Sequence, residues 1–437
     1  MHFISTRNGD LSVLFSQAVR ECAPSDGGVF VPYSIEDMRR WIYYIDESTS
    51  FTSIAGSLTS AVMNDEYSPI ICEKIATDAF PFEPNVVQLD ENLFQMQLYT
   101  GFTGQQRDFG ISYMCSYLEN TLELEGQKAV ILDFTFGGLG SILAKCLRGK
   151  KNIKAVLVFQ KGTVQGLSEE DFVWNGGNIY PVEMDAPIEQ IRNVIFEIYE
   201  NKEFVNEHKI TIANTTNVCR MFGQLMYFPY SFARIKNRVS DDIYYALNAG
   251  NYGTIMGALY SWRFALPLSG IFTPCTNELS VDSFGKPVIY DGSFDVHGRK
   301  RVNPVNPANL ERLEYFFKEN ELMMRNFIYP SMVTEKEIVN SAKVLYKKYG
   351  VVADKDTASA YACVLGNNNV ESDGEAAVVL LSNNHPSYSN EFCKTVYGRE
   401  LELPANVKET LQQVDLKRPL VSCKEEIMKI VEKIGSF

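Results

Sequence analysis

The chain has 437 residues, 45% hydrophobic and 22% charged, which is typical of a globular protein with two or three domains. Its 41 Lys and Arg against 54 Asp and Glu give a net charge of −13, which argues against broad binding to nucleic acids or anionic membranes. The 9 cysteines are scattered without a C-x-x-C spacing, so we expect neither a disulfide framework nor a zinc site. No membrane-spanning run or signal-peptide pattern is visible, so we expect a cytoplasmic protein.

The first 90 residues predict a mixed, mainly helical domain. Residues 3–7 form a short apolar strand pattern, and a helix pattern begins at Leu14. A glycine turn at 26–28 leads into a second apolar strand at 29–32, and residues 52–62 again predict a helix. We expect this region to form an N-terminal cap domain.

The rest of the chain alternates strand and helix patterns, which predicts parallel sheets with helices on their faces. The continuous apolar runs at 129–132, 155–159 and 377–381 are typical of buried parallel strands. We expect further helices at 141–147, 220–235 and 255–264, and a further strand at 244–247. The predicted organisation is an α/β fold with a cap over 1–90, a first α/β region over 91–235, and a second α/β region with C-terminal helices over 236–437.

The stretch from Leu98 to Met114, LYTGFTGQQRDFGISYM, predicts a strand, a tight turn and a helix start, an arrangement that places side chains at a cleft edge. It resembles the segment LFHGPTLAFKDFGARFM of threonine synthases, which are pyridoxal-phosphate enzymes of fold type II. The matching residues are Leu98, Gly101, Thr103, Asp108, Phe109, Gly110 and Met114. Similar segments follow in the same order from Phe3 to Pro386. The resemblance therefore implies fold type II for nearly the whole chain.

Arg107 stands where the family has the lysine that carries the cofactor as a Schiff base. A lysine amine can lose its proton and attack an aldehyde, whereas an arginine guanidinium stays protonated. We therefore do not expect covalent attachment of pyridoxal phosphate to Arg107, although its planar donor fork suits a phosphate or carboxylate. Lys145 and Lys161 are candidate substitutes, but Lys161 matches a second lysine that the family already has, and the sequence places neither of them in the cleft.

Two further segments resemble parts of the family that hold the substrate. Residues 135–140 resemble TSGDTG, a loop that grips the substrate carboxylate in fold type II enzymes, but Phe136, Gly138 and Leu139 replace its polar side chains. Residues 214–220 resemble NSINWAR. The candidate substrate or anion ligands are therefore the residues kept in these segments, namely Thr135, Gly137, Gly140, Asn217 and Arg220.

Two more segments resemble parts of the family that hold the cofactor. Residues 248–254 resemble PSGNFGN, which holds the cofactor phosphate, and backbone N–H groups in such loops can bind an anion whatever the side chains are. Residues 381–386 resemble the family segment LSTAHP, whose threonine is expected to contact the pyridine nitrogen of the cofactor. In this chain Asn383 takes the place of that threonine. The candidate cofactor ligands are Gly250, Asn251, Tyr252, Gly253, Thr254 and Asn383.

The resemblance implies conversion of O-phosphohomoserine to threonine and phosphate, with the cofactor as electron sink. The changes at Arg107, at 136–139 and at Asn383 predict a homologue without this lyase activity, which keeps a site for a small anionic ligand near Arg107 and Gly250–Gly253. Two alternatives stay open: an active lyase using noncovalent cofactor or another lysine, and a noncatalytic binding or interaction protein. We expect no metal, nucleic acid or membrane partner, and the sequence does not indicate the oligomeric state.

Overall fold

A computed structural model describes residues 1–240, 242–289, 300–307, 309–318, 320–367 and 376–435. Its largest sheet has six strands in the order β14-β11-β10-β15-β5-β4, and every neighbouring pair is parallel except β4 with β5. The strands are β4 (Asn85–Asp90), β5 (Leu93–Gln97), β10 (Ile243–Ala246), β11 (Gly270–Pro274), β14 (Ile328–Ser331) and β15 (Ala377–Ser382). All six residues of β15 are buried, as the apolar run at 377–381 predicts.

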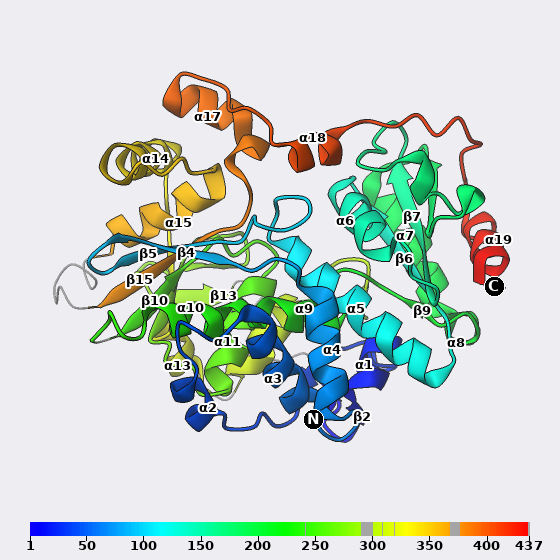
Figure 1. Cartoon of the computed structure of the whole chain (residues 1–437), viewed down its shortest axis with the longest axis horizontal. Coiled ribbons are helices and arrows are strands. Elements are labelled where there is room, and N and C mark those ends of the chain that lie inside the picture. The colour runs from blue at the N-terminus through cyan, green and yellow to red at the C-terminus, as the bar shows by residue number, and fades with distance from the viewer. Residues whose placement is uncertain (241, 290–299, 308, 319, 368–375, 436–437) are drawn as a thin grey trace.

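A second parallel sheet has four strands in the order β8-β7-β6-β9. They are β6 (Ala129–Thr135), β7 (Ile153–Gln160), β8 (Ile179–Met184) and β9 (Ile210–Thr211). The predicted buried strands at 129–132 and 155–159 are confirmed as parts of β6 and β7. Figure 1 shows the two parallel sheets on opposite sides of the molecule, with α5 (Arg107–Glu125) running between them.

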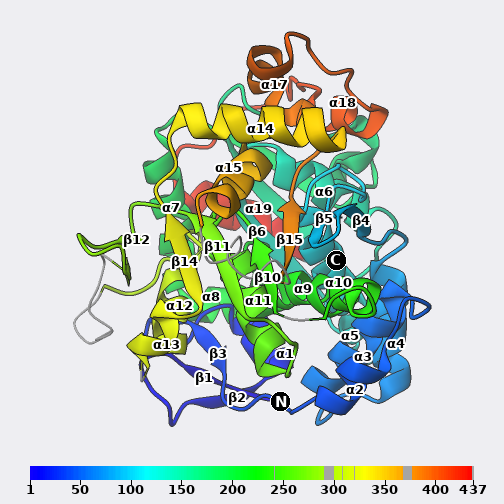
Figure 2. The ribbon, with the colours of Figure 1, turned by 90° about the vertical axis from the view of Figure 1, so that its left-hand side faces the viewer.

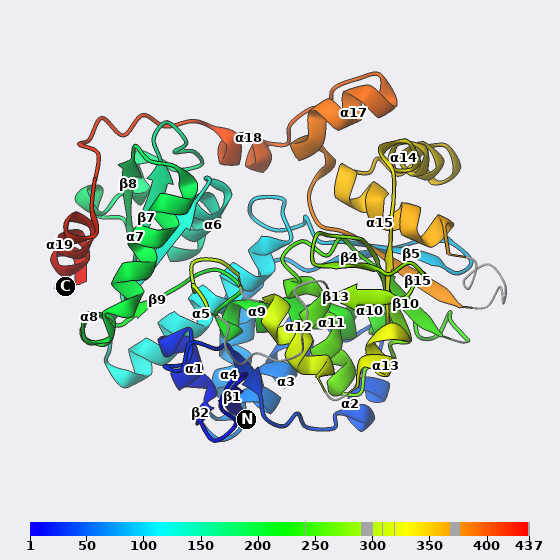
Figure 3. The ribbon, with the colours of Figure 1, turned by 180° about the vertical axis from the view of Figure 1, so that it is seen from behind.

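Helices cover both parallel sheets. In Figures 1 and 3, α14 (Glu335–Tyr349) and α15 (Lys355–Leu365) lie on one side of the six-stranded sheet, and α10 (Tyr227–Ile235) and α11 (Gly253–Arg263) on the other. The helices around the smaller sheet are α6 (Gly138–Leu147), α7 (Ile188–Glu200), α8 (Lys202–Glu207) and α19 (Lys424–Gly435). The remaining helices of these regions are α9 (Val218–Leu225), α12 (Asn309–Phe317), α13 (Glu321–Arg325), α17 (Asn390–Tyr397) and α18 (Ala405–Leu411).

The N-terminal region forms an antiparallel sheet of three strands in the order β2-β1-β3, with helices beside it (Figure 2). Its elements are β1 (His2–Ser5), β2 (Ser12–Leu14), α1 (Phe15–Glu21), β3 (Phe30–Pro32), α2 (Arg39–Tyr44), α3 (Phe51–Met63) and α4 (Pro69–Ala79). A separate hairpin pairs β12 (Leu279–Val281) with β13 (Pro287–Ile289). Short 3-10 turns occur at Glu169–Asp171, Val173–Asn175 and Pro386–Ser389.

The structure differs from the sequence prediction at the helix expected over 220–235. Two helices occur there instead, because α9 ends at Leu225 and α10 begins at Tyr227. Pro229 explains the break, since proline has no N–H to donate to the carbonyl four residues earlier, that of Leu225. The first of the two helices carries Arg220 toward the space between the parallel sheets.

The strands are not distributed as three consecutive blocks of sequence. The hairpin β4–β5 comes from residues 85–97, yet it completes the six-stranded sheet by pairing with β15 near the end of the chain. The division at 90 and 235 stays a prediction. Within the described ranges, no helix combines the length and the apolar character that crossing a bilayer requires.

Candidate functional site

A cavity of about 590 Å³ opens between the two parallel sheets. It is lined by residues at the carboxyl ends of β6, β10 and β15, together with the first residues of α5 and a face of α9. The carboxyl ends of parallel strands are where α/β folds commonly bind ligands, because the loops there converge on one crevice. This cavity is therefore the candidate site.

Asp108 shapes the turn that begins α5. Its carboxylate accepts hydrogen bonds from the backbone N–H of Thr103 at 2.7 Å and from the Thr103 hydroxyl at 2.5 Å. A β-carbon at Gly101 would lie 2.7 Å from the Asp108 side chain, so only glycine fits there. Burial raises the pKa of Asp108, and the hydrogen bonds from Thr103 oppose that rise. Gly101, Thr103 and Asp108 do not line the cavity. They fix the turn that places Gln105, Gln106 and Arg107 in its lining.

Arg107 is the first residue of α5 and lines the cavity. A β-carbon placed at Gly138 would lie 2.9 Å from Nη1 of Arg107, so the guanidinium rests against the glycine that begins α6. Within the part of the chain that the structure describes, the guanidinium has no hydrogen-bond or ion-pair partner. Burial lowers the pKa of Arg107, and the charges of Asp108 and Tyr388 oppose that shift. Arg107 is thus a charged donor available to a ligand.

Arg220 and Gln224 lie one turn apart on α9 and both line the cavity. Arg220 is 7% exposed, and its Nε and Nη1 atoms are buried without a hydrogen-bond partner. A β-carbon at Gly110 would lie 3.0 Å from Arg220 Nη1, which places this guanidinium against the first turn of α5. Burial lowers the pKa of Arg220 to about 10, and the Arg107 cation contributes to that shift.

Three side-chain amide oxygens in the same cavity also lack partners. They belong to Gln105, Gln224 and Asn383. Buried polar atoms are almost always satisfied in folded proteins, so a group of unsatisfied atoms around one cavity indicates a ligand that would satisfy them. We did not identify Gln105 and Gln224 from the sequence. The signal for Gln224 was its position four residues after Arg220, which puts both side chains on the same helix face.

Asp133 is a further cavity residue that the sequence analysis did not single out. It is 1% exposed and accepts hydrogen bonds from the N–H groups of Phe134 at 2.8 Å and Ala213 at 3.2 Å. Burial raises its pKa to about 7, although these bonds and the Arg220 cation act in the opposite direction. The sequence signal that could have identified Asp133 is a carboxylate inside an otherwise apolar strand. Asp133 is one of the titratable groups whose charge acts on Arg220.

Of the candidates in the 135–140 loop, the cavity lining includes Thr135 but neither Gly137 nor Gly140. The Thr135 hydroxyl accepts the N–H of Gly137 at 2.9 Å, which closes the turn. Gly137 has φ +116°, a conformation that favours glycine, and a β-carbon at Gly140 would lie 3.1 Å from the Phe159 ring. The structure gives these glycines packing roles, and the lining also contains Phe136, Gly138 and Leu139.

In the 248–254 loop, Gly250, Asn251 and Thr254 line the cavity, whereas Tyr252 and Gly253 do not. The Tyr252 hydroxyl contacts Glu278 at 2.8 Å, outside the cavity lining. Two N–H groups of the loop already have partners, because Asn248 accepts from Gly250 at 3.0 Å and Asn251 accepts from Gly253 at 3.1 Å. Fewer backbone donors therefore remain for a bound phosphate.

Asn383 and Asn217 have opposite placements. Asn383 follows the last residue of β15, and its backbone carbonyl accepts the N–H of Gln106 at 2.6 Å, so the 381–386 segment lies beside the turn before α5. Asn217 is fully buried outside the cavity lining. It caps α9 by accepting the N–H of Cys219 at 3.0 Å and donates to the Val19 carbonyl at 3.0 Å. Its contacts are those of a structural residue.

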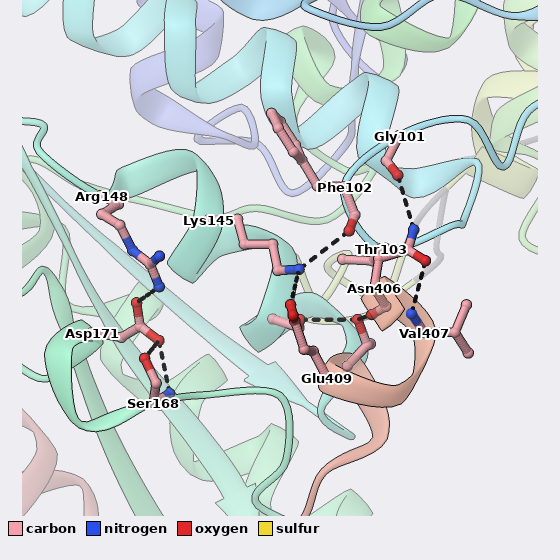
Figure 4. A network of polar contacts seen from close by, with 12 residues as sticks. Gly101, Phe102, Thr103, Lys145, Arg148, Ser168, Asp171, Asn406, Val407 and Glu409 are labelled. Atoms are coloured by element: carbon pink, nitrogen blue, oxygen red, sulfur yellow. Dashed lines mark hydrogen bonds and ion pairs between the residues drawn. The ribbon is translucent and has the colours of Figure 1, made fainter. Parts of the chain in front are cut away.

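The two lysines considered as substitutes for the Schiff-base lysine do not line the cavity. Lys145 donates to the Phe102 carbonyl at 3.3 Å and to Glu409 at 3.0 Å, and so ties α6 to α18 (Figure 4). Lys161 forms an exposed ion pair with Asp185 at 2.7 Å. The described residues that line the cavity include Arg107, Arg192 and Arg220 but no lysine.

The C-terminal segment closes one side of the cavity. Thr410 and Leu411 of α18 belong to the lining, and Asn406 donates to the Gly101 carbonyl at 3.4 Å (Figure 4). Beyond α18 the chain crosses to the smaller sheet and ends in α19, as Figure 1 shows in red. Among the described residues, no group of three His, Cys, Asp or Glu side chains is arranged to hold a metal ion.

Comparison with solved structures defines the class. The structure matches a pyridoxal-phosphate-bound threonine synthase from Brucella melitensis with a TM-score of 0.79, at 17% identity and with 100% of both chains covered. It matches threonine synthase from Escherichia coli with a TM-score of 0.77, at 21% identity, covering 99% of this chain and 100% of that one. The chain therefore has the fold of the type II pyridoxal-phosphate enzymes.

Sequence comparison finds threonine synthases that are similar to nearly the whole chain. The chain is 24% identical over 407 residues to threonine synthase of Haemophilus influenzae, covering 92% of this chain and 93% of that protein. It is also 24% identical over 430 residues to threonine synthase of Escherichia coli, covering 97% and 96%. No family model matches the chain. The protein is a homologue of the threonine synthases.

Proposed function

We propose that this threonine synthase homologue binds a small anion noncovalently in the cavity and does not catalyse the threonine synthase reaction. The observation that carries the proposal is the composition of the cavity: Arg107 begins α5 with an unpartnered guanidinium, and no described lining residue is a lysine. Because a Schiff base requires a primary amine, the residues present do not fit covalently held pyridoxal phosphate. They do fit an anion, since neither the Arg107 guanidinium nor the Nε and Nη1 atoms of Arg220 have a hydrogen-bond partner among the described residues.

Pyridoxal phosphate, when an enzyme holds it on a lysine, would supply an electron sink for amino-acid chemistry. In this chain, Asn383 offers an amide near the end of β15, and the Gly250 loop has two of its N–H groups already bonded. These features support weaker retention of the cofactor than in an enzyme with a lysine at this position. We therefore derive no catalytic step through it.

The first test is the absorbance spectrum of the purified protein with and without added pyridoxal phosphate, beside the variants Arg107→Lys and Arg107→Gln. We expect no Schiff-base band from the wild type or from Arg107→Gln. We expect Arg107→Lys to gain a band that borohydride reduces, because it restores an amine at the start of α5. Arg107→Gln is the matched control, since it changes the same residue without supplying an amine.

A Schiff-base band in the wild type, or turnover of O-phosphohomoserine at a rate comparable to that of a threonine synthase, would contradict the proposal. A mass shift on the reduced protein would then identify the lysine used. If Arg107→Lys also shows no Schiff-base band, the cavity does not accept the cofactor. In that case the anion has to be sought among molecules unrelated to pyridoxal phosphate.

A further inference from the structure

A second cavity, of about 260 Å³, lies between the N-terminal sheet and the helices α11 and α12 (Figure 2). It shares no lining residue with the candidate site, and its lining comes from β1, β3, the loop after β3, α11, α12 and the residue after α12. Among the described lining residues, four are aromatic, three are basic and none is acidic. In a chain with a net charge of −13, this cavity is a local positive region.

Two of the three basic residues have no counter-charge of their own. Arg263 and Lys318 form no ion pair with any residue that the structure describes. Arg312 differs, because its guanidinium donates to three backbone carbonyls and the charge of Glu311 acts on it. Glu311 is itself held by Arg7 at 3.0 Å. Arg263 and Lys318 are therefore the cations that a ligand can use.

Tyr260 presents a hydroxyl without a partner to the same cavity. The residue is 4% exposed, and its hydroxyl forms no hydrogen bond with any described residue. Burial raises the pKa of Tyr260, and the Arg312 and Arg263 cations oppose that rise, so the hydroxyl faces the basic part of the lining. Because buried polar groups almost always have a partner, this hydroxyl indicates a ligand that accepts its proton in a hydrogen bond.

The cavity also offers aromatic faces to a planar ring. Tyr33 follows β3, is 67% exposed and contacts no other aromatic ring among the described residues. On the α12 side, Nζ of Lys318 lies 3.9 Å from the centroid of the Tyr315 ring. Aromatic side chains stack well on the faces of heteroaromatic bases, and cations also favour such faces. The lining therefore combines sites for a ring with sites for an anion.

We propose that this second cavity binds a small aromatic phosphate ester, the class that includes nucleoside monophosphates. Arg263 and Lys318 hold the phosphate, the Tyr260 hydroxyl donates to it, and the ring stacks on Tyr33. A phosphate monoester has a charge of about −1.5 to −2 at pH 7 and so matches two cations, whereas a carboxylate would leave one of them without a partner. The inference goes beyond the proposed function, because the two cavities have no residue in common.

Calorimetric titration of the full-length protein at low ionic strength tests the class of ligand. The three probes are adenosine monophosphate, adenosine, which lacks the phosphate, and ribose 5-phosphate, which lacks the ring. We expect saturable binding of adenosine monophosphate, and binding of each of the other two that is weaker by about 10-fold or more. This pattern requires both the anion and the ring for recognition.

Substitution of the two free cations tests where the ligand binds. We expect the double variant Arg263→Gln/Lys318→Gln to bind adenosine monophosphate about 10-fold more weakly, since each exposed ion pair contributes up to about 5-fold. Lys394→Gln is the matched control, because Lys394 is exposed, pairs with Glu400 at 2.9 Å and lies outside the lining. Weaker binding in Arg107→Gln, with none lost in the double variant, would place the ligand in the candidate site and overturn the inference.

Two tyrosine substitutions separate the hydrogen bond from the stacking. Tyr260→Phe removes only the hydroxyl and should weaken binding of adenosine monophosphate about 10-fold. Its thermal melt should match that of the wild type, because no hydrogen bond within the described chain is lost. Tyr33→Ala should weaken adenosine monophosphate about 10-fold but leave ribose 5-phosphate unchanged. Tyr44→Ala is its control, since Tyr44 is 84% exposed and lies outside the lining.

Three further results would overturn the inference. They are no saturable binding of adenosine monophosphate by the folded wild type, binding of adenosine or ribose 5-phosphate within about 3-fold of it, and unchanged affinity in both Tyr260→Phe and the double variant. Circular dichroism shows that each variant is folded before its affinity is compared. The proposed function fails instead on a Schiff-base band or on threonine synthase turnover, so the two proposals can fail separately.

Discussion

Arg312 and Arg220 are two buried arginines of the same chain with opposite surroundings. Arg312 is fully buried, and its guanidinium donates to the carbonyls of Phe30, Thr215 and Thr216 and to the Asn309 side chain. Arg220 is 7% exposed and has two buried donor atoms without partners. Burial lowers the pKa of each to about 10. The difference teaches that hydrogen-bond satisfaction, more than burial or pKa, separates a structural arginine from a binding one.

The largest effect should come from Arg312→Gln. The substitution leaves buried carbonyls of the N-terminal sheet and of the segment before α9 without donors, so we expect the free energy of unfolding to fall by about 3 kcal/mol or more. Denaturant unfolding measured by circular dichroism checks this. If the free energy of unfolding falls by less than about 1 kcal/mol, water replaces the guanidinium, and Arg312 is then not a structural arginine in contrast to Arg220.

The pH dependence of anion binding should sharpen the comparison next. Burial raises the pKa of Asp133 to about 7, so its carboxyl is mostly neutral below that pH and mostly charged above it. The charged form would attract Arg220 and repel a bound anion. We therefore expect sulfate, whose own charge is constant over this range, to bind about 10-fold more tightly at pH 6 than at pH 8.

Calorimetric titrations at the two pH values measure this effect, and Asp133→Asn is the control that should remove it. Among the described residues, the titratable groups that interact with Asp133 include Arg220, Cys22 and Tyr199. Burial raises the pKa of Cys22 to about 11 and that of Tyr199 well above its usual value, so both stay neutral between pH 6 and 8. Tighter binding at pH 8 would exclude Asp133 as the controlling group.

A smaller effect, of opposite sign to that of Arg312→Gln, is expected for Arg220→Gln in the absence of any anion. The substitution removes a buried charge whose Nε and Nη1 atoms have no hydrogen-bond partner. At pH 6, where Asp133 is mostly neutral, the free energy of unfolding should therefore stay constant or rise by up to about 1 kcal/mol. Unfolding curves in anion-free buffer measure it. A fall of about 3 kcal/mol, as for Arg312, would make Arg220 a structural residue.

The smallest effect should come from Glu409→Gln, which removes the ion pair with Lys145. The Glu409 side chain is 64% exposed, so water screens the pair, and we expect the free energy of unfolding to change by less than about 0.5 kcal/mol. A thermal melt beside the wild type is sufficient. A change of about 2 kcal/mol or more would mean that α18 is held mainly by this charge.

The sequence correctly predicted the strands that a short run of neighbouring residues is sufficient to indicate. The apolar runs of β6, β7 and β15 were found because buried parallel strands need continuous apolar residues. The break between α9 and α10 was missed, although Pro229 marks it. The resemblance correctly indicated the fold, and it drew attention to Arg107 and Arg220, which the structure brings into one cavity.

What could not be predicted depends on contacts between distant residues. That Gly138 adjoins Arg107 and Gly110 adjoins Arg220 follows only from how α5, α6 and α9 pack. The same is true of Asn217, which the motif suggested as a ligand but whose amide is used to cap α9 and to bind Val19. A motif fixes which residue occurs at a position, while its neighbours in space decide which of its atoms are free.

The place of β15 has a consequence for synthesis on the ribosome. This strand lies between β10 and β5 in the six-stranded sheet, yet residues 377–382 are made after more than four fifths of the chain. Until it emerges, β5 and β10 each present an open edge of unpaired backbone groups, which is the kind of surface that aggregates. The nascent protein should therefore depend on chaperone protection until translation is nearly complete, and a chain truncated before residue 377 should accumulate as insoluble material.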